Sequence, residues 1–218
     1  MNQQLVLPIS ELYHENDDYI LTKCNAKAYT RLMEFGSQRS AALYDNAIIL
    51  FGAKASGKSL ILSLWAKKYS AKTLNVSDFD FLIEKNLRAL VIDDIDKNQD
   101  EEKLLHIFNW CNQNDIFLCM SAVNLESLFL PDLTSRIKSI EKIVIEKADD
   151  EMLKIFMLKQ FSNFSIHISD QVIKFIAEHV TRDLGYIKEF IFALNKTSLE
   201  KNKKISIELV KELIKKVS

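Results

Sequence analysis

The sequence has no long apolar run, no predominance of one charge and very little glycine. No apolar run approaches the roughly 20 residues that span a bilayer, so we expect no membrane helix. The polar, acidic start of the chain is not typical of a secretory signal. A formal net charge of −1 gives no overall attraction to nucleic acid. Only four of the 218 residues are glycines, so two glycines in one short segment are informative.

Cysteine is also rare. The three cysteines, Cys24, Cys111 and Cys119, lie far apart and in no spacing typical of a metal site. We expect them to be reduced and buried in a cytoplasmic protein. With 218 residues, 48% of them hydrophobic, the chain can form one large domain, or a medium domain and a small one.

The two glycines that stand close together belong to a phosphate-binding loop. Residues 52–59 read Gly-Ala-Lys-Ala-Ser-Gly-Lys-Ser, which is a complete G-x-x-x-x-G-K-[ST] motif. The apolar run 47–51 predicts a buried strand before the loop, and residues 58–68 predict a helix after it. Glycines let the backbone approach phosphates closely, and the N-terminus of a helix attracts anions. The predicted nucleotide-binding residues are Gly52, Ala53, Lys54, Ala55, Ser56, Gly57, Lys58, Ser59 and Leu60, with Lys58 on the β- and γ-phosphates and Ser59 on Mg²⁺.

A second chemical signal is an apolar strand that ends in two carboxylates, Ala89 to Asp94. It resembles a Walker B element, which ends beside the nucleotide. We predict that Asp93 holds Mg²⁺, directly or through water. Asp94 is predicted to orient or activate an attacking water, which is a catalytic role. The alternative is a strand that runs into an acidic turn. This alternative is stronger for Asp94 than for Asp93, because many such proteins carry Glu at the position of Asp94.

The order of the predicted elements indicates an α/β fold. Further strands are predicted at 72–76, 116–121 and 143–145, and a helix at about 103–112. Strands that alternate with helices predict a parallel five-stranded sheet covered on both faces. From residue 149 the apolar spacing is helical throughout and predicts four helices, with Ser169 as an N-cap. We therefore divide the chain into an N-terminal peptide and linker (1–17), an α/β nucleotide-binding domain (18–147) and a small helical lid domain (148–218).

Together these features resemble the AAA+ family, and its DnaA branch in particular. The segment Leu133-Thr134-Ser135-Arg136-Ile137 is similar to the L-x-S-R segment of that branch. Ile20 to Ala28 is similar to its opening segment, whose backbone flanks the adenine. The resemblance spans 18–215 and implies ADP or ATP with Mg²⁺ as cofactors and Arg136 as an arginine finger, a catalytic residue. The alternative for Arg136 is an arginine at a strand–helix junction that covers the sheet edge. We expect the N-terminal oligomerisation domain and the DNA-binding domain of DnaA to be missing.

The first residues resemble a peptide that binds the sliding clamp of DNA polymerase. Gln4-Leu5-Val6-Leu7-Pro8 is similar to Q-L-[SD]-L-P, with Val6 as a departure. Leu7 precedes a proline and is biased to an extended conformation, which suits a peptide laid in a groove. The alternative is an ordinary N-terminal strand. The clamp-binding residues implied by the resemblance are Gln4, Leu5, Leu7 and Pro8.

A DnaA-like module with such a peptide resembles the Hda family of regulatory inactivators of DnaA. The resemblance implies that the protein docks on the DNA-loaded clamp and promotes hydrolysis of ATP held by DnaA. The implied partners are the sliding clamp and DnaA, in the cytoplasm at the replisome. Contact with DNA would be mainly indirect, through the clamp, and homo-oligomerisation is left open.

Two departures from the family pattern concern the chain's own ATP hydrolysis. The strand that ends Met120-Ser121-Ala122 lacks the acid usual in DnaA relatives, and the lid position of the sensor arginine is Gly185. Arg182, three residues earlier and expected on the same helical face, is predicted to substitute in nucleotide binding; a solvated surface arginine is the alternative. We therefore expect weak or no intrinsic hydrolysis. The alternative functions are an autonomous AAA+ ATPase and a helicase-loader-like protein that acts on DNA.

Overall fold

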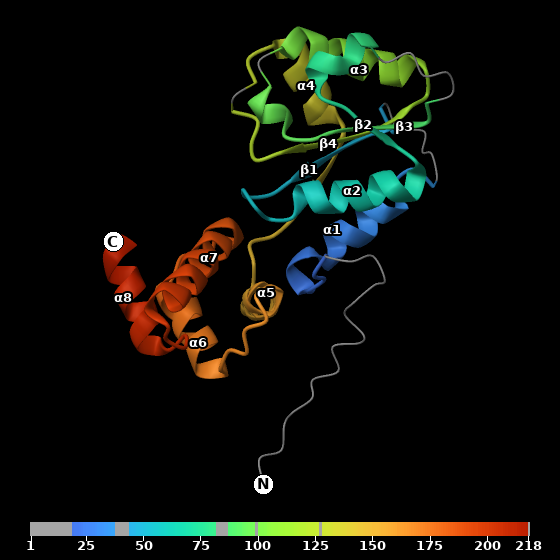
Figure 1. Cartoon of the computed structure of the whole chain (residues 1–218). Coiled ribbons are helices and arrows are strands. Elements are labelled where there is room, and N and C mark those ends of the chain that lie inside the picture. The colour runs from blue at the N-terminus through green and yellow to red at the C-terminus, as the bar shows by residue number, and fades with distance from the viewer. Residues whose placement is uncertain (1–18, 38–43, 82–86, 99, 127, 218) are drawn as a thin grey trace.

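The computed structural model describes residues 19–37, 44–81, 87–98, 100–126 and 128–217 (Figure 1). The first part of the chain forms a five-stranded sheet in the order β2-β3-β4-β1-β5. Every pair of neighbouring strands is parallel, which confirms the predicted α/β class. The strands are β1 (Ala47–Phe51), β2 (Lys72–Thr73), β3 (Ala89–Ile92), β4 (Phe117–Ala122) and β5 (Glu141–Val144).

Helices cover both faces of this sheet. The helices α1 (Lys23–Glu34) and α2 (Lys58–Tyr69) lie on one face, and α3 (Glu101–Gln113) and α4 (Pro131–Ser139) lie on the other (Figure 1). Successive side chains of a strand point to opposite faces. In β1, Ile48 and Leu50 accordingly pack into the core on the α1 and α2 side, whereas Ile49 packs into the core on the α3 and α4 side.

Several element boundaries differ from the predictions. The strand predicted at 72–76 has two residues, because the chain then turns into a short 3₁₀ helix, η2 (Val76–Phe81), which buries Val76. The strand β3 ends at Ile92, before the two acids. Helix α4 was not predicted; Pro131 suits its first turn, and Leu133 and Ile137 are its buried residues.

The C-terminal part is a bundle of four helices, as predicted. They are α5 (Asp150–Asn163), α6 (Asp170–His179), α7 (Leu184–Lys201) and α8 (Ile207–Val217). The bundle has its own apolar core, which includes Phe161, Ile176 and Ile191. Ser169 is the N-cap residue of α6, as predicted. The bundle lies beside the carboxyl end of the sheet and is joined to it through residues 145–149 (Figure 1).

Two predictions about the surface and the thiols can be compared with the structure. All three cysteines are buried and unpaired, as predicted. Within the described ranges, no helix has the length and apolar character needed to cross a membrane.

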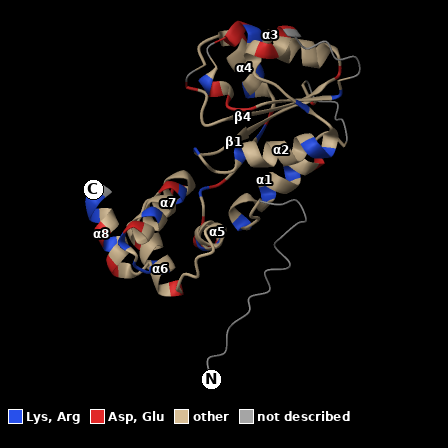
Figure 2. Ribbon diagram, viewed as in Figure 1, with Lys and Arg blue, Asp and Glu red and all other residues tan. Residues whose placement is uncertain are grey.

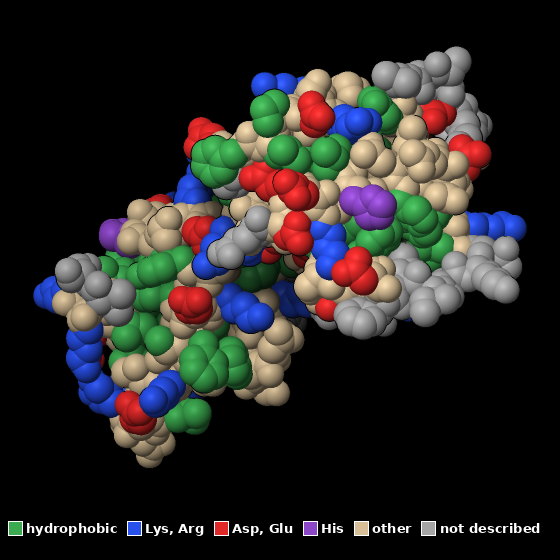
Figure 3. Space-filling view, turned by 90° about the horizontal axis from the view of Figure 1, so that it is seen from above, with side chains coloured by type: hydrophobic (Ala, Val, Ile, Leu, Met, Phe, Trp, Pro, Cys, Tyr) green, Lys and Arg blue, Asp and Glu red, His purple; other side chains and the backbone are tan. Residues whose placement is uncertain are grey.

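Basic and acidic side chains are interspersed over both parts of the molecule (Figure 2). On the face formed by α3 and α4, acidic side chains gather next to apolar ones (Figure 3).

Candidate nucleotide-binding site

The phosphate-binding loop lies between the carboxyl end of β1 and the first turn of α2. Gly57 is the N-cap residue of α2 and has φ of +92°, a conformation that glycine adopts without steric cost. A Cβ atom on Gly52 would lie 2.5 Å from the Ser56 hydroxyl oxygen. The loop therefore requires glycine at both positions, which explains why the scarce glycines of the chain are found here.

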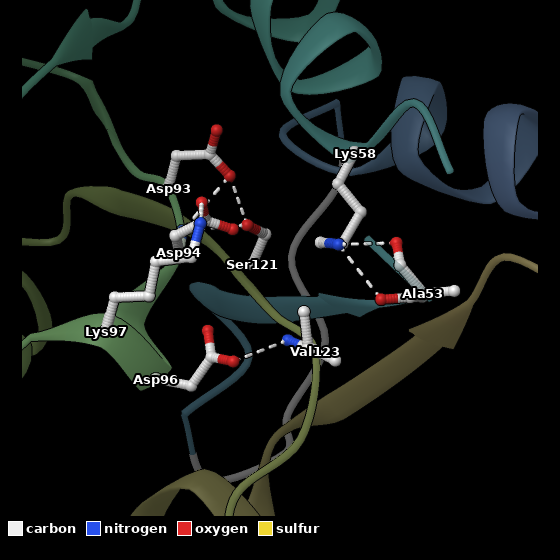
Figure 4. Close-up of polar contacts among 9 residues, drawn as sticks. Ala53, Lys58, Asp93, Asp94, Asp96, Lys97, Ser121 and Val123 are labelled. Carbon is white, nitrogen blue, oxygen red and sulfur yellow. Dashed lines mark hydrogen bonds and ion pairs between the residues drawn. The ribbon is translucent and has the colours of Figure 1, made fainter. Parts of the chain in front are cut away.

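Lys58 is folded across this loop. It is 5% exposed, and its ammonium group donates hydrogen bonds to the carbonyl oxygens of Gly52, at 2.9 Å, and Ala53, at 3.0 Å (Figure 4). The hydroxyl of Ser56 is buried without a hydrogen-bond partner among the described residues, and such a group normally needs one. Ser59 is exposed at the start of α2. These residues fit a bound phosphate, with Ser59 available to Mg²⁺.

Asp93 and Asp94 follow β3 and face β4, the neighbouring strand. The Ser121 hydroxyl in β4 donates a hydrogen bond to Asp93 (Figure 4). The backbone N–H of Asp94 donates to Ser121 Oγ at 2.9 Å and to Asp93 Oδ1 at 3.1 Å. Ser121 is fully buried and thus fixes the Asp93 carboxylate from the adjacent strand. The predicted Mg²⁺ ligands Asp93 and Ser59 both lie at the carboxyl edge of the sheet.

Asp94 has a different environment from Asp93. Its φ of +52° is in the left-handed region, and it is the N-cap residue of the short 3₁₀ helix η3 (Ile95–Lys97). Its carboxylate forms an ion pair with Lys97 (Figure 4). The hydrogen bond with Asp94 raises the pKa of Lys97, so the lysine stays charged. The predicted catalytic acid is therefore already paired with a cation.

Two hollows flank the phosphate-binding loop. One, of about 370 Å³, lies between the loop and the lid, where Cys24, Ile145, Met152 and Leu184 contribute apolar walls. The other, of about 280 Å³, lies on the side of Ser59 and Asp94 and is lined by Lys54, Lys58 and Lys97 as well. An apolar hollow suits a base, and a hollow lined by lysines suits phosphates.

The lid contacts the phosphate-binding loop through the first turn of α7. A Cβ atom on Gly185 would lie 3.0 Å from the Cβ atom of Ala55. The prediction that Arg182 shares a helical face with Gly185 is wrong, because α7 begins at Leu184 and Asp183 is its N-cap. Arg182 forms an ion pair with Asp150 and lines the larger hollow. Its role in nucleotide binding stays a prediction.

Arg136 lies near the amino end of the parallel strands, opposite the end that carries the phosphate-binding loop. Its Nη1 donates a hydrogen bond of 2.9 Å to the hydroxyl of Tyr44, and its guanidinium carbon is 5.8 Å from the centre of the Tyr44 ring. Tyr44 comes just before β1, whereas the phosphate-binding loop follows β1. The five residues of β1 span roughly 16 Å. Arg136 is therefore directed away from the nucleotide site of its own chain.

Three contacts were not foreseen from the sequence. Tyr44 and Lys97 bind predicted site residues, but neither is part of a motif. Ser121 was noted in the sequence only as part of the strand that lacks the usual acid, and its position as the one polar residue of β4 is a signal that could have indicated this contact. The predicted clamp-binding residues Gln4, Leu5, Leu7 and Pro8 lie outside the described residues.

Comparisons with known proteins find a family model that matches the lid and solved structures that share the fold. Residues 149–214 match the family described as Hda, lid domain. A protein of Haemophilus influenzae, described as uncharacterized, is 25% identical over 234 residues, which cover 98% of this chain and 99% of the relative.

Three solved structures share the fold. Domain III of the replication initiation protein DnaA from Thermotoga maritima has a TM-score of 0.72 and 18% identity, over 91% of this chain and 94% of that one. AMPPCP-bound DnaA from Aquifex aeolicus has a TM-score of 0.63 and 19% identity, over 84% of this chain and 65% of that one. The Thermotoga maritima RuvB branch migration motor, with a TM-score of 0.66 and 18% identity, matches over 87% of this chain and 67% of its own. The fold is therefore that of an AAA+ module.

Proposed function

We propose that the chain is an Hda-like, DnaA-related protein that regulates the initiation of chromosomal replication, because residues 149–214 match the Hda lid domain and the fold is that of DnaA domain III. In this proposal it binds an adenine nucleotide with Mg²⁺, docks on the sliding clamp and promotes hydrolysis of ATP held by DnaA. The nucleotide would fix the angle between sheet and lid, and thereby the shape of the DnaA-binding face.

Nucleotide binding is supported by the geometry of the loop. Lys58, the unpartnered Ser56 hydroxyl and the N-terminus of α2 converge where phosphates would lie, and the apolar hollow beside the lid has room for a base. A DnaA structure with the same fold holds AMPPCP. Mg²⁺ is usually held by one or two carboxylates together with phosphate oxygens and water, a role for which Asp93 and Ser59 are suited.

Intrinsic hydrolysis is expected to be weak. A general base must be free to accept a proton from the attacking water, but Asp94 is paired with Lys97. The lid presents Gly185 rather than an arginine to the phosphate-binding loop. Bound nucleotide would consequently persist and serve as a structural ligand.

The position of Arg136 carries the proposal that the chain acts on another protein's ATP. An arginine finger stabilises charge on the transferred phosphoryl group across an interface. Arg136 lies at the end of the strands opposite the chain's own phosphate-binding loop, and among the described residues its guanidinium donates one hydrogen bond, to Tyr44. A guanidinium has five N–H donors in a planar fork, so most of them remain for a phosphate of a partner.

Docking on the clamp would bring this arginine to DnaA on DNA. The residues proposed for that contact are Gln4, Leu5, Leu7 and Pro8, which form a short and hence weak peptide. A ring-shaped clamp offers repeated sites, and repeated sites allow a weak peptide to be retained through multivalency.

A reconstituted assay with DnaA, clamp-loaded DNA and this protein tests the proposal. Arg136→Ala should abolish the conversion of DnaA-bound ATP to ADP, because an arginine finger contributes a factor of ~10³ or more to the rate. Arg136→Lys should not restore it, since a point charge cannot reproduce the planar fork. Nucleotide binding and clamp binding by both variants should equal those of the wild type.

A second variant separates recruitment from chemistry. Gln4→Ala with Leu5→Ala should remove binding to immobilised clamp and clamp-dependent stimulation, with the thermal stability of the fold unchanged. Full stimulation by Arg136→Ala would exclude Arg136 from the mechanism. If the protein instead hydrolysed ATP by itself and Asp94→Asn stopped that turnover, an autonomous ATPase would replace the adaptor as the better interpretation.

A further inference from the structure

A lysine outside the predicted motifs faces the phosphate-binding loop. Lys97 ends η3, three residues after Asp94, and lines the 280 Å³ hollow together with Lys58 and Ser59. The loop contributes one wall of this hollow, and Asp94, Lys97 and Val123 contribute the other. Figure 4 shows Lys58 on one side, with Asp93, Asp94, Ser121 and Lys97 on the other.

The two walls would meet different parts of a nucleotide. The backbone of a phosphate-binding loop and its lysine hold the β-phosphate of ADP as well as of ATP. The third phosphate of ATP extends beyond them, toward the side of Mg²⁺ and the strand-end acids. In this chain that side carries Lys97, and no arginine lines the hollow within the described part of the chain.

We propose that Lys97 binds the terminal phosphate of ATP, and that it exchanges the Asp94 carboxylate for that phosphate when ATP replaces ADP. The protein would thereby distinguish ATP from ADP without a lid arginine. This inference rests on the proposed binding of an adenine nucleotide.

The contacts of Lys97 make the exchange feasible. Its ion pair is with Asp94, three residues earlier in the chain, and lies at the surface, since 64% of the lysine side chain is exposed. Exposed pairs of this kind contribute little stability. A phosphate group carries more charge than a carboxylate and offers more acceptor oxygens, and lysine binds it as a mobile point charge. The exchange would release the Asp94 carboxylate in the ATP-bound state, where weak hydrolysis would then rest on the lid, which presents Gly185 and not an arginine to the loop.

Besides the two loop lysines that line the same hollow, Lys54 and Lys58, the candidate cation of the lid is held elsewhere. Arg182 is paired with Asp150 within the lid, and Gly185 occupies the lid position that contacts the loop. Ser121, at the end of β4, is engaged with Asp93 and Asp94. Among the side chains that the lid, β4 and η3 bring near the loop, Lys97 is thus the one that is positively charged and lines the hollow on the phosphate side.

Calorimetric titration of the purified protein with Mg-ADP and with Mg-AMPPCP tests the inference. Lys97→Ala should weaken AMPPCP binding roughly tenfold or more, the scale of one charge-assisted hydrogen bond, and should leave ADP binding unchanged. Lys142→Ala, which removes an exposed lysine from β5, is the matched control and should change neither.

A double-mutant comparison separates a specific exchange from general electrostatics. Asp94→Asn frees Lys97 and should strengthen AMPPCP binding relative to ADP, and this gain should vanish when Lys97 is also alanine. A gain that persists without Lys97 would mean that Asp94 acts only by repelling phosphate, which contradicts the exchange. Equal losses of ADP and AMPPCP affinity in Lys97→Ala, or no loss of either, would overturn the role of Lys97. Wild-type protein that binds neither nucleotide would overturn the proposed function as well.

Discussion

The Lys58 ammonium group holds the phosphate-binding loop in this structure and is proposed to hold a nucleotide as well. It bridges the carbonyl oxygens of Gly52 and Ala53 and thereby closes the phosphate-binding loop on itself. When a nucleotide binds, the same group would turn to its phosphates. A buried lysine that already has acceptors requires little reorganisation of the loop, so the binding site is largely preformed.

Replacing Lys58 should therefore affect binding more than folding. Lys58→Ala should weaken ADP and AMPPCP binding by about 2 to 5 kcal/mol, the cost of removing one charge from a desolvated pair. Lys54→Ala, an exposed neighbour in the same loop, should have a much smaller effect. Isothermal calorimetry on the three proteins measures this difference. Equal affinities for wild type and Lys58→Ala would mean that the loop does not hold nucleotide.

At the scale of elements, the first turn of α7 is the part of the lid that meets the loop. Asp183 caps this helix, with its carboxylate accepting a hydrogen bond of 2.7 Å from the N–H of Tyr186. Gly185 in the same turn approaches Ala55 so closely that a side chain would be crowded. The cap thus fixes the turn that forms one side of the apolar hollow.

Loss of the Asp183 cap should weaken nucleotide binding as well as the fold. Asp183→Ala should lower the free energy of unfolding by about 1 kcal/mol, as is typical for an N-cap, and also weaken nucleotide binding. Asp100→Ala is the matched control, because Asp100 caps α3 through the N–H of Lys103, away from the lid. It should cost similar stability and leave binding unchanged. Denaturant titration together with calorimetry measures both quantities, and equal binding by the two variants would argue against a coupled lid.

The elements also show which features a sequence can predict. The strands β1 and β4 were predicted within a residue or two because buried parallel strands are continuous apolar runs. Helix α4 was missed, since only Leu133 and Ile137 of its nine residues are buried and two apolar positions do not make a periodic pattern. Lys58 could be singled out because the spacing of a phosphate-binding loop is specific, and Asp93 because an apolar strand that ends in acids resembles a Walker B element.

Contacts between distant segments could not be predicted in this way. Ser121 of β4 reaches Asp93 at the end of the neighbouring strand β3, 28 positions away in the chain, and Tyr44 reaches Arg136 across 92 positions. Such pairs depend on strand order and on which helix covers which face, and no local pattern records either. The wrong placement of Arg182 on α7 has a different origin, because the signal was local: Asp183 is a favoured N-cap residue and starts the helix after Arg182.

At the scale of the whole molecule, burial of thiols makes folding sensitive to alkaline pH. Cys111, on the buried face of α3, lies in the core, and burial raises its pKa from the ordinary value of 9.0 to about 12. Cys119, in the centre of β4, is fully buried, and burial raises its pKa well above that value. Both thiols therefore stay protonated in the folded protein at pH values where the unfolded chain has already lost the protons.

The sign of the effect follows from this difference in proton binding. A pKa that is higher in the folded state contributes stability that is complete below the unfolded value of 9.0 and is lost as the pH rises toward about 12. Above pH 9 the folded protein binds more protons than the unfolded chain, so the free energy of unfolding should fall by about 1.4 kcal/mol per pH unit for each such thiol.

A variant without the two thiols isolates their contribution from that of other groups that lose protons at alkaline pH. Cys111→Ala with Cys119→Ala should cost stability at about pH 8 because it leaves small cavities, and the free energy of unfolding should then decline less steeply toward about pH 11. Urea titrations at several pH values measure both curves. Parallel curves for wild type and the double variant would mean that the two thiols are already accessible to solvent and that the core around β4 opens more readily than its complete burial implies.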